Sequence, residues 1–197
     1  TREGEEALLL SGYMKATLPP DFLLMIVPRH PQRFVEVAKL FEDQGLRVAR
    51  KSQLKGEAVP ADAQVLVGDT MGEMFAYYTA CDFAFIGGSL LPLGGQNLIE
   101  AAACGTPTLV GPHTYNFAAA AEAAILTGAA QRLPDTASDT TSGNTAPITP
   151  EAIAEALYRW LSDPPALALA ARATADFVQQ STGATARTLA LMTISTQ

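Results

Sequence analysis

Apolar and polar residues follow two patterns along the chain, one typical of buried strands and one typical of amphipathic helices. Apolar runs predict strands at 21–27, 46–49, 63–68, 83–86, 108–110 and 130–133. Helical spacing predicts helices at 4–16, 31–44, 72–80, 97–104 and 117–126. In the second of these helices Phe34, Val37, Ala38 and Phe41 share one face, and Gly45 follows the last turn. Alternating strands and helices with short connections predict an α/β fold, a Rossmann-like parallel sheet with helices on both faces.

The pattern changes after residue 133. Residues 134–149 are rich in Ser, Thr, Asp and Pro and have no apolar period, which predicts a mobile surface loop. Thr149 is then expected to cap a helix that has Pro150 in its first turn. Helices should continue to about residue 194, with breaks at Pro164-Pro165 and at 179–185. We therefore divide the chain into a domain at 1–133, a loop at 134–149 and helices at 150–197 that pack on the same domain.

Composition excludes several classes of function. The formal net charge of −7 argues against a nucleic-acid partner, which requires clustered Lys and Arg. Cys81 and Cys104 have no CxxC spacing and are expected to be reduced packing residues of a cytosolic protein. His30 and His113 do not have the spacing of metal ligands, so we expect no metal and no cofactor. No apolar run approaches the roughly 18 residues that span a bilayer.

The most polar and glycine-rich connections all follow predicted strands. They come after Val27, Val67, Ile86 and Val110. In open parallel sheets, ligands bind beyond the carboxyl ends of the strands. We therefore expect these four turns to form one binding site.

The turn after Ile86 contains two glycine pairs, Gly87-Gly88 and Gly94-Gly95, and leads into the helix predicted to start near Asn97. A helix N-terminus favours a phosphate, and a carboxylate at Glu100 suits the two hydroxyls of a ribose. In this interpretation Gly94-Gly95 clears space for the phosphate. The alternative is that the stretch is only a helix cap that Glu100 completes, and spacing alone does not separate the two. The dinucleotide and P-loop fingerprints are absent.

The other three turns also allow a structural or a ligand-binding role. Arg29 lies between two prolines and is either a positioned ligand clamp or one partner of a surface ion pair. Asp69 or Thr70 is expected to cap the following helix, where Met71 and Gly72 would present backbone groups to a flat base. His113 is either a general base or a hydrogen-bonding structural residue.

Four separated motifs together resemble one enzyme family. They are VPRHPQRF at 27–34, GDTMGEM at 68–74, FIGGSL…GGQNLIE at 85–100 and GPHTYNF at 111–117. In order and spacing they resemble the C-terminal domain of 3-deoxy-D-manno-octulosonic acid (Kdo) transferases, which are glycosyltransferases of the GT-B architecture. The resemblance covers most of residues 1–128 and is weaker in the terminal helices.

The resemblance implies a function and a set of partners. The donor would be CMP-Kdo and the acceptor a lipid A precursor, in lipopolysaccharide synthesis at the cytoplasmic face of the bacterial inner membrane. Transfer would invert the anomeric centre without a metal. The acceptor domain, the catalytic carboxylate and the membrane anchor would belong to an N-terminal half. The segment at 1–6 resembles the loop after the first donor-domain strand, so we expect that strand to precede Thr1 and the chain to be a fragment. It should bind CMP alone without catalysis.

The resemblance also assigns residues. No catalytic residue is expected in this chain. Nucleotide contacts would come from three of the turns, at Pro28, Arg29, His30, Met71, Gly72, Glu73, Asn97, Leu98, Ile99 and Glu100. Contacts to the donor sugar or phosphate would come from Ser89, Gly95, Gln96 and His113. The family commonly has His where this chain has Gln96, so a histidine role there is not carried over. The remaining alternatives are a GT-B enzyme that uses a UDP-sugar, either a transferase or an epimerase, and a non-catalytic Rossmann-type binding module.

Overall fold

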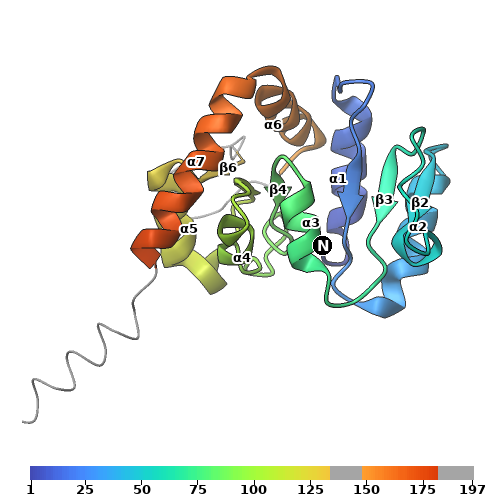
Figure 1. The fold of residues 1–197 in the computed structure, drawn as a ribbon, viewed down its shortest axis with the longest axis horizontal. Helices are drawn as coiled ribbons and strands as arrows, with labels where there is room; N and C mark the ends of the chain where they lie inside the picture. The colour runs from blue at the N-terminus through green and yellow to red at the C-terminus, as the bar shows by residue number, and fades with distance from the viewer. Residues whose placement is uncertain (134–147, 182–197) are drawn as a thin grey trace, which may run out of the picture.

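The computed structural model describes residues 1–133 and 148–181 (Figure 1). Within them, six short strands form two parallel sheets. One sheet has the order β1-β3-β2 and consists of β1 (Leu24–Ile26), β2 (Val48–Arg50) and β3 (Val65–Val67). The other has the order β4-β5-β6 and consists of β4 (Ala84–Phe85), β5 (Thr108–Val110) and β6 (Ala130–Arg132). The parallel α/β fold is confirmed, but the expected single sheet is two sheets.

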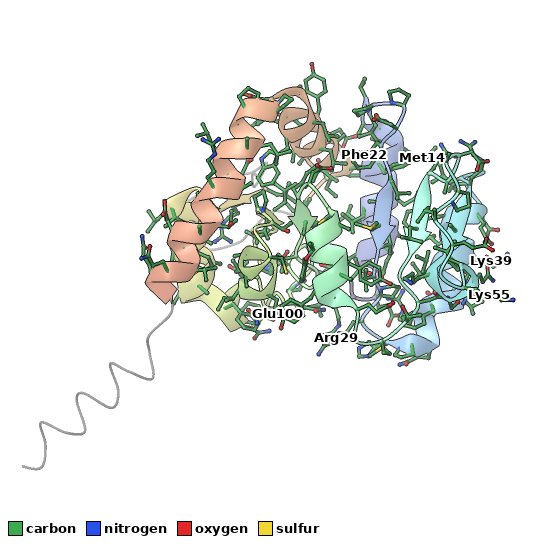
Figure 2. The ribbon with its side chains drawn as sticks, in the orientation of Figure 1. Met14, Phe22, Arg29, Lys39, Lys55 and Glu100 are labelled. Carbon is green, nitrogen blue, oxygen red and sulfur yellow. The ribbon has the colours of Figure 1, made fainter. Side chains whose placement is uncertain are left out.

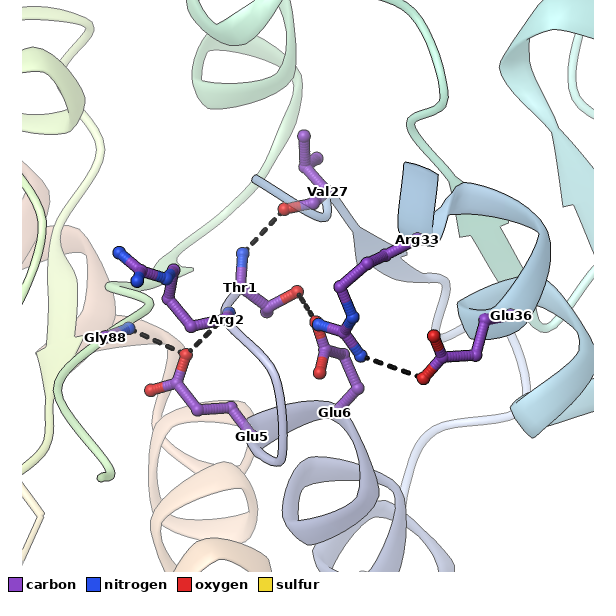
Figure 3. A network of polar contacts seen from close by, with 8 residues as sticks. All are labelled: Thr1, Arg2, Glu5, Glu6, Val27, Arg33, Glu36 and Gly88. Carbon is purple, nitrogen blue, oxygen red and sulfur yellow. Dashed lines mark hydrogen bonds and ion pairs between the residues drawn. The ribbon is translucent and has the colours of Figure 1, made fainter. Parts of the chain in front are cut away.

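Thr1 lies between the two sheets. Its amino nitrogen donates to the carbonyl oxygen of Val27 at 2.6 Å, and its carbonyl accepts from the amide of Arg29 at 2.9 Å. On its other side, a Cβ built at Gly87 would lie 2.9 Å from its Cα. Val27 follows β1 and Gly87 follows β4. The edge strands of the two sheets are therefore joined through this residue rather than by direct pairing (Figure 3).

The helices predicted within the described residues are all present in the predicted order. The helical elements are α1 (Glu5–Lys15), η1 (Pro31–Arg33), α2 (Phe34–Glu42), η2 (Lys51–Gln53), α3 (Met74–Ala80), α4 (Ile99–Ala103), η3 (Tyr115–Phe117), α5 (Ala118–Thr127), α6 (Pro150–Ser162) and α7 (Pro164–Ser181). Of these, α1, α2, α3 and α4 are shorter than predicted, whereas η2 was not predicted. The predicted cap of α6 is confirmed, because Thr149 Oγ1 accepts from the amide of Ala152 at 3.3 Å. The break at Pro164-Pro165 is the junction between α6 and α7. Most of the loop predicted at 134–149 (residues 134–147) and the helix predicted beyond 181 lie outside the described residues. The break predicted at 179–185 is wrong for its first three residues, because α7 continues through Ser181.

Helices cover both faces of the β4-β5-β6 sheet. Val110 on β5 packs into one apolar cluster with residues of α4, α5 and α7, including Phe177. Its neighbour Leu109 points to the other face and packs with α6, including Trp160. This alternation is what a strand requires when both of its faces are buried. Figure 1 shows α7 and α5 on the outer side of this half.

α1 connects the two halves of the core. Leu10 packs with Val65, Val67 and α2 in the core of the β1-β3-β2 sheet. Leu8 packs instead with the cluster that contains Trp160. The predicted apolar face of α2 is confirmed, since its four residues are all buried. One helix thus holds a fixed position against both sheets.

α1 also packs closely on α6 at Gly12. A Cβ built at Gly12 would lie 2.5 Å from Cγ2 of Ile153, well inside a normal contact. Because glycine has no side chain, the two helices can approach each other closely at this position. An exposed ion pair between Lys15 and Glu151 lies beside the same contact, at 2.5 Å.

We expect Gly12→Val to lower the free energy of unfolding by about 2 kcal/mol, because overpacking a close contact forces the helices apart. Urea unfolding measures this change. The control is Ala7→Val at an exposed position of α1, which carries only the small propensity cost of a β-branched residue. Equal unfolding midpoints for Gly12→Val and the parent protein would show that α1 and α6 do not pack as described.

Candidate functional site

The four predicted turns lie at one edge of the molecule and are hydrogen-bonded to their neighbours. The amide of Gly68, after β3, donates to Ile26 at the end of β1 at 2.8 Å. The amide of His113, after β5, donates to the carbonyl of Ser89, after β4, at 3.0 Å. Thr1 joins the β1 and β4 turns, as described above. The prediction that strand ends bring these turns together therefore agrees with the fold.

Glu5 fixes the centre of this edge. Its carboxylate is fully buried and accepts three main-chain hydrogen bonds, of which Figure 3 shows those from Gly88 and Arg2. Oε2 accepts from Gly88 at 2.7 Å and from Arg2 at 2.9 Å, and Oε1 accepts from Leu90 at 3.1 Å. One buried charge therefore sets the course of the turn after β4 and of the segment before α1.

Glu6 has a parallel role toward the other sheet. Its side chain is also fully buried, and Oε1 accepts from the Thr1 hydroxyl at 2.7 Å. The same oxygen accepts from Nη1 of Arg33 in η1 at 2.9 Å, and Arg33 also bonds Glu36 at 3.3 Å (Figure 3). The sequence pattern alone places Glu5 and Glu6 in the first turn of a predicted helix, where acids suit the helix dipole. It gives no sign of their distant partners, which are Gly88 and Leu90 for Glu5 and Arg33 for Glu6.

The turn after β4 is locked to the turn after β5. Ser89 is fully buried, and its hydroxyl donates to the carbonyl of Ile86 at 2.5 Å and accepts from the amide of Gly111 at 2.8 Å. The amides of Gly95 and Gln96 donate to Gly88 and Gly87. Contacts of Ser89, Gly95 and Gln96 with a donor sugar stay predictions. The structure gives the Ser89 hydroxyl a role in holding the two turns.

The space that a side chain at Gly94 would need is occupied by another part of the protein. Its φ is +89°, and a Cβ there would lie 2.2 Å from Nδ2 of Asn116. Asn116 uses this nitrogen to donate to Leu93 at 3.2 Å and to Gly95 at 3.4 Å. The interpretation that Gly94-Gly95 clears space for a phosphate is therefore wrong for Gly94, whose side-chain space is filled by the turn after β5.

The N-cap residue of α4, Leu98, makes no side-chain cap, and the residue before it, Asn97, makes the local hydrogen bonds that the capping alternative implies. Asn97 Oδ1 accepts from the amide of Ile99 at 3.0 Å, and Asn97 Nδ2 donates to Oε1 of Glu100 at 3.3 Å. The capping alternative is therefore present, while Glu100 Oε2 has no partner among the described residues. Leu98 is buried in the core, so only its backbone can contact a ligand. Because α4 has five residues rather than the eight predicted, its dipole is weaker than expected.

Three predicted residues are exposed at this edge. Arg29, His30 and Met71 are open to solvent, whereas Pro28 is buried. The ion-pair alternative for Arg29 is not seen, since its guanidinium has no partner among residues 1–133 and 148–181. Figure 2 shows Arg29 and Glu100 along the same edge of the molecule. An unpaired arginine and a carboxylate with a free oxygen are thus available to a ligand there.

The turn after β3 is held by two carboxylates. Thr70 donates to Glu73, and Nζ of Lys51 lies 3.7 Å from the other oxygen of Glu73. The Thr70 hydrogen bond, with a smaller contribution from Lys51, lowers the pKa of Glu73. Gly72 is exposed beside it with a φ of +83°. The Glu73 side chain is therefore partly occupied before any nucleotide binds.

Asp69 does not cap α3 as expected. It is buried and binds the turn after β2, accepting from the Ser52 amide at 2.7 Å, the Ser52 hydroxyl at 2.6 Å and Arg50 Nε at 2.9 Å. Burial raises the pKa of Asp69, but the hydrogen bonds from Ser52 and Arg50 outweigh it, so the pKa lies below its ordinary value. Asp69 therefore fixes the base of the turn that carries Met71 and Gly72.

His113 lines a hollow of about 420 Å³ together with residues that include Tyr115 and Arg132. Nη1 of Arg132 donates to the carbonyls of Gly111 at 3.2 Å and Pro112 at 3.3 Å, which stiffens this turn. A general-base role for His113 is not tested by this geometry.

Comparison with known proteins places these features in a family. No family model matches the chain. The chain is 52% identical over 139 residues to the 3-deoxy-D-manno-octulosonic acid transferase of Bordetella pertussis, a match covering 68% of this chain and 32% of that protein. It is 40% identical over 119 residues to the transferase of Haemophilus influenzae, covering 59% and 27%. It also matches the crystal structure of the C-terminal CMP-Kdo binding domain of WaaA from Acinetobacter baumannii. That match has a TM-score of 0.75 and 27% identity, and covers 91% of this chain and 86% of that one.

The chain belongs with the C-terminal domains of the Kdo transferases. It spans about a third of the length of the curated relatives that it matches. The resemblance expected from the four motifs is therefore confirmed by sequence and by fold. No helix among the described residues of this Kdo transferase domain is long and apolar enough to cross a membrane.

We expect Glu5→Gln to lower the free energy of unfolding of the domain by about 2–3 kcal/mol, because an amide nitrogen would face main-chain N–H groups that lose their acceptor. Urea unfolding measures this loss. Glu3→Gln is the matched control, since Glu3 is exposed on the same segment and should change the value by less than about 0.5 kcal/mol. Similar losses for both variants would contradict the organising role of Glu5.

We expect Asp69→Asn to destabilise the domain by about 2 kcal/mol at pH 7, since it weakens hydrogen bonds to a buried charge. A depressed pKa stabilises the fold fully above the ordinary Asp value of about 3.9, and this stabilisation is lost as the pH falls below it. The difference in unfolding free energy between the parent protein and the variant should therefore become smaller as the pH falls from 7 to 3. Unfolding curves across this range measure it, with Asp62→Asn in the exposed Arg47 ion pair as control. A constant difference would contradict the ionised state of Asp69.

Proposed function

We propose that this domain binds the donor CMP-Kdo at the edge formed by the turns after β1, β3, β4 and β5. The observation that carries the proposal is the match to a CMP-Kdo binding domain over 91% of this chain, together with the four motifs at one edge. Unsatisfied binding groups at that edge, an arginine and a carboxylate oxygen, support it.

The proposed contacts follow from the chemistry of each residue. The exposed guanidinium of Arg29 is suited to the phosphate of CMP, because an arginine fork binds phosphate oxygens in pairs. The exposed thioether of Met71 and the adjacent backbone at Gly72 offer a flat apolar surface to the cytosine ring. Glu100 has an oxygen available for the ribose hydroxyls, while its other oxygen is held by Asn97.

The proposed activity of the whole protein is transfer of Kdo from CMP-Kdo to a lipid A precursor with inversion at the anomeric carbon. The catalytic base would lie outside this chain, in an acceptor-binding half at the inner membrane. The relatives are named as Kdo transferases, and this supports the reaction class. The domain alone is therefore expected to bind the nucleotide and to transfer nothing.

Calorimetric titration with CMP tests the proposal, with UMP and UDP as competitors. The parent chain should bind CMP at micromolar to millimolar concentration, more tightly than UMP or UDP. Glu100→Ala should weaken CMP binding by roughly 1.5–3 kcal/mol, the value of hydrogen bonds to a charged group. Glu155→Ala, in an exposed ion pair on α6, is the control and should leave binding unchanged.

Each other outcome has a definite meaning. A folded parent chain that does not bind millimolar CMP would overturn the donor site. A preference for UDP would favour an enzyme that uses a UDP-sugar. Unchanged CMP affinity in Glu100→Ala would remove Glu100 from the ribose contact but leave the domain assignment in place.

A further inference from the structure

Most cationic side chains of the domain are already neutralised. Of the twelve Lys and Arg residues in the described part of the chain, eight form ion pairs with carboxylates. Among the described residues, the four without a carboxylate partner are Arg2, Arg29, Lys55 and Arg172. Lys55 lies beyond β2 at the outer end of its sheet (Figure 2). Arg172 is exposed on α7. Only Arg2 and Arg29 lie at the donor edge.

Arg2 and Arg29 are held close to each other by their backbones. The amide of Arg29 donates to the carbonyl of Thr1, the residue before Arg2, at 2.9 Å. The amide of Arg2 donates to the same Glu5 oxygen that binds the amide of Gly88. Figure 3 shows the Arg2 side chain pointing away from Glu5, on the side of Thr1 that faces the Gly88 turn. Its backbone is therefore fixed between the β1 and β4 turns, while the guanidinium of this half-buried residue has no partner among the described residues.

Glu5 does not neutralise Arg2 directly. Both of its carboxylate oxygens are engaged by main-chain amides, and it is fully buried. A guanidinium without a carboxylate in contact retains its full set of N–H donors for a ligand. Arginine binds carboxylate and phosphate groups in the same two-pronged geometry.

We propose that Arg2 is a second donor-binding side chain, which contacts an anionic group of the sugar nucleotide. This inference rests on the proposed function. A CMP-linked sugar acid has two anionic groups, the phosphate and the sugar carboxylate, and the edge has two unpaired arginines. Arg29 follows β1 and Arg2 reaches the same edge from between the sheets, so two separated charges of one ligand can be bound together. An arginine can bind the phosphate or the sugar carboxylate in the same way. Binding measurements with ligands that carry one or both of these groups identify which one Arg2 contacts.

The test compares Arg2→Gln, Arg2→Lys and the parent chain against three probes: cytidine, CMP and CMP-Kdo. Cytidine has no anion, CMP has the phosphate alone, and CMP-Kdo has both groups. Arg2→Gln should weaken binding of CMP-Kdo roughly tenfold or more, the range for a hydrogen bond to a charged group. Arg2→Lys should restore part of the loss. Arg172→Gln removes an exposed arginine of α7, an element that provides none of the proposed contacts, and should leave all three affinities unchanged. Thermal unfolding checks that each variant is folded.

The pattern across probes decides the outcome. Loss of affinity for both CMP and CMP-Kdo assigns Arg2 to the phosphate. Loss for CMP-Kdo alone assigns it to the sugar carboxylate. Equal losses for cytidine and CMP-Kdo would mean that Arg2 supports the fold only, and unchanged affinities would remove it from the site; either result overturns the proposal. If the parent chain binds none of the probes, the proposed function itself fails, which is a separate result.

Discussion

The edge formed by the four turns depends on a buried carboxylate, Glu5, that has no cation in contact with it among the described residues. Glu5 is removed from water, and its charge is stabilised by three main-chain N–H groups from two parts of the chain. A buried ion without such partners would cost several kcal/mol, so all three amides must be present together. The Gly88 turn and the segment before α1 therefore assume their positions jointly. The placement of Arg2 and of the turn after β4 follows from this single constraint.

Other buried polar groups hold the remaining turns of this edge in the same way. Glu6 is fixed by Thr1 and Arg33, Asp69 by Ser52 and Arg50, and the turns after β4 and β5 by the Ser89 hydroxyl. Asp69 and Ser89 each join two connections that follow different strands, and Glu6 joins the segment before α1 to the connection after β1. The cost of ordering these turns is met before a ligand arrives, which is how a binding site becomes preorganised. The exposed residues Arg29 and Met71 are then presented from a rigid base.

Local sequence was a good guide wherever the structure is decided by neighbours along the chain. The strand at 108–110, the apolar face that contains Val37, and the Thr149 cap each rest on residues within a few positions of each other. Prediction failed where the deciding partner is distant in sequence. Glu5 meets Gly88 more than 80 positions away, and the space beside Gly94 is filled by Asn116 from the turn after the next strand. The single sheet was predicted because strand patterns carry no information about which edges pair. The family motifs located the candidate site. The long-range contacts that hold its turns together are visible only in the structure.

For the proposed anionic donor to bind, the local charge at this edge of the acidic domain must differ from the overall charge. The net charge of −7 gives a long-range field that disfavours an approaching sugar nucleotide. This field is screened beyond about 8–10 Å at ordinary ionic strength, so it affects encounter more than the bound state. Within that distance the balance of charge differs, because Arg33 is neutralised by Glu6 while, in the described part of the chain, no carboxylate contacts Arg2 or Arg29. Affinity should therefore depend on direct contact with these guanidinium groups, and specificity on how well their separation matches the two charges of the donor.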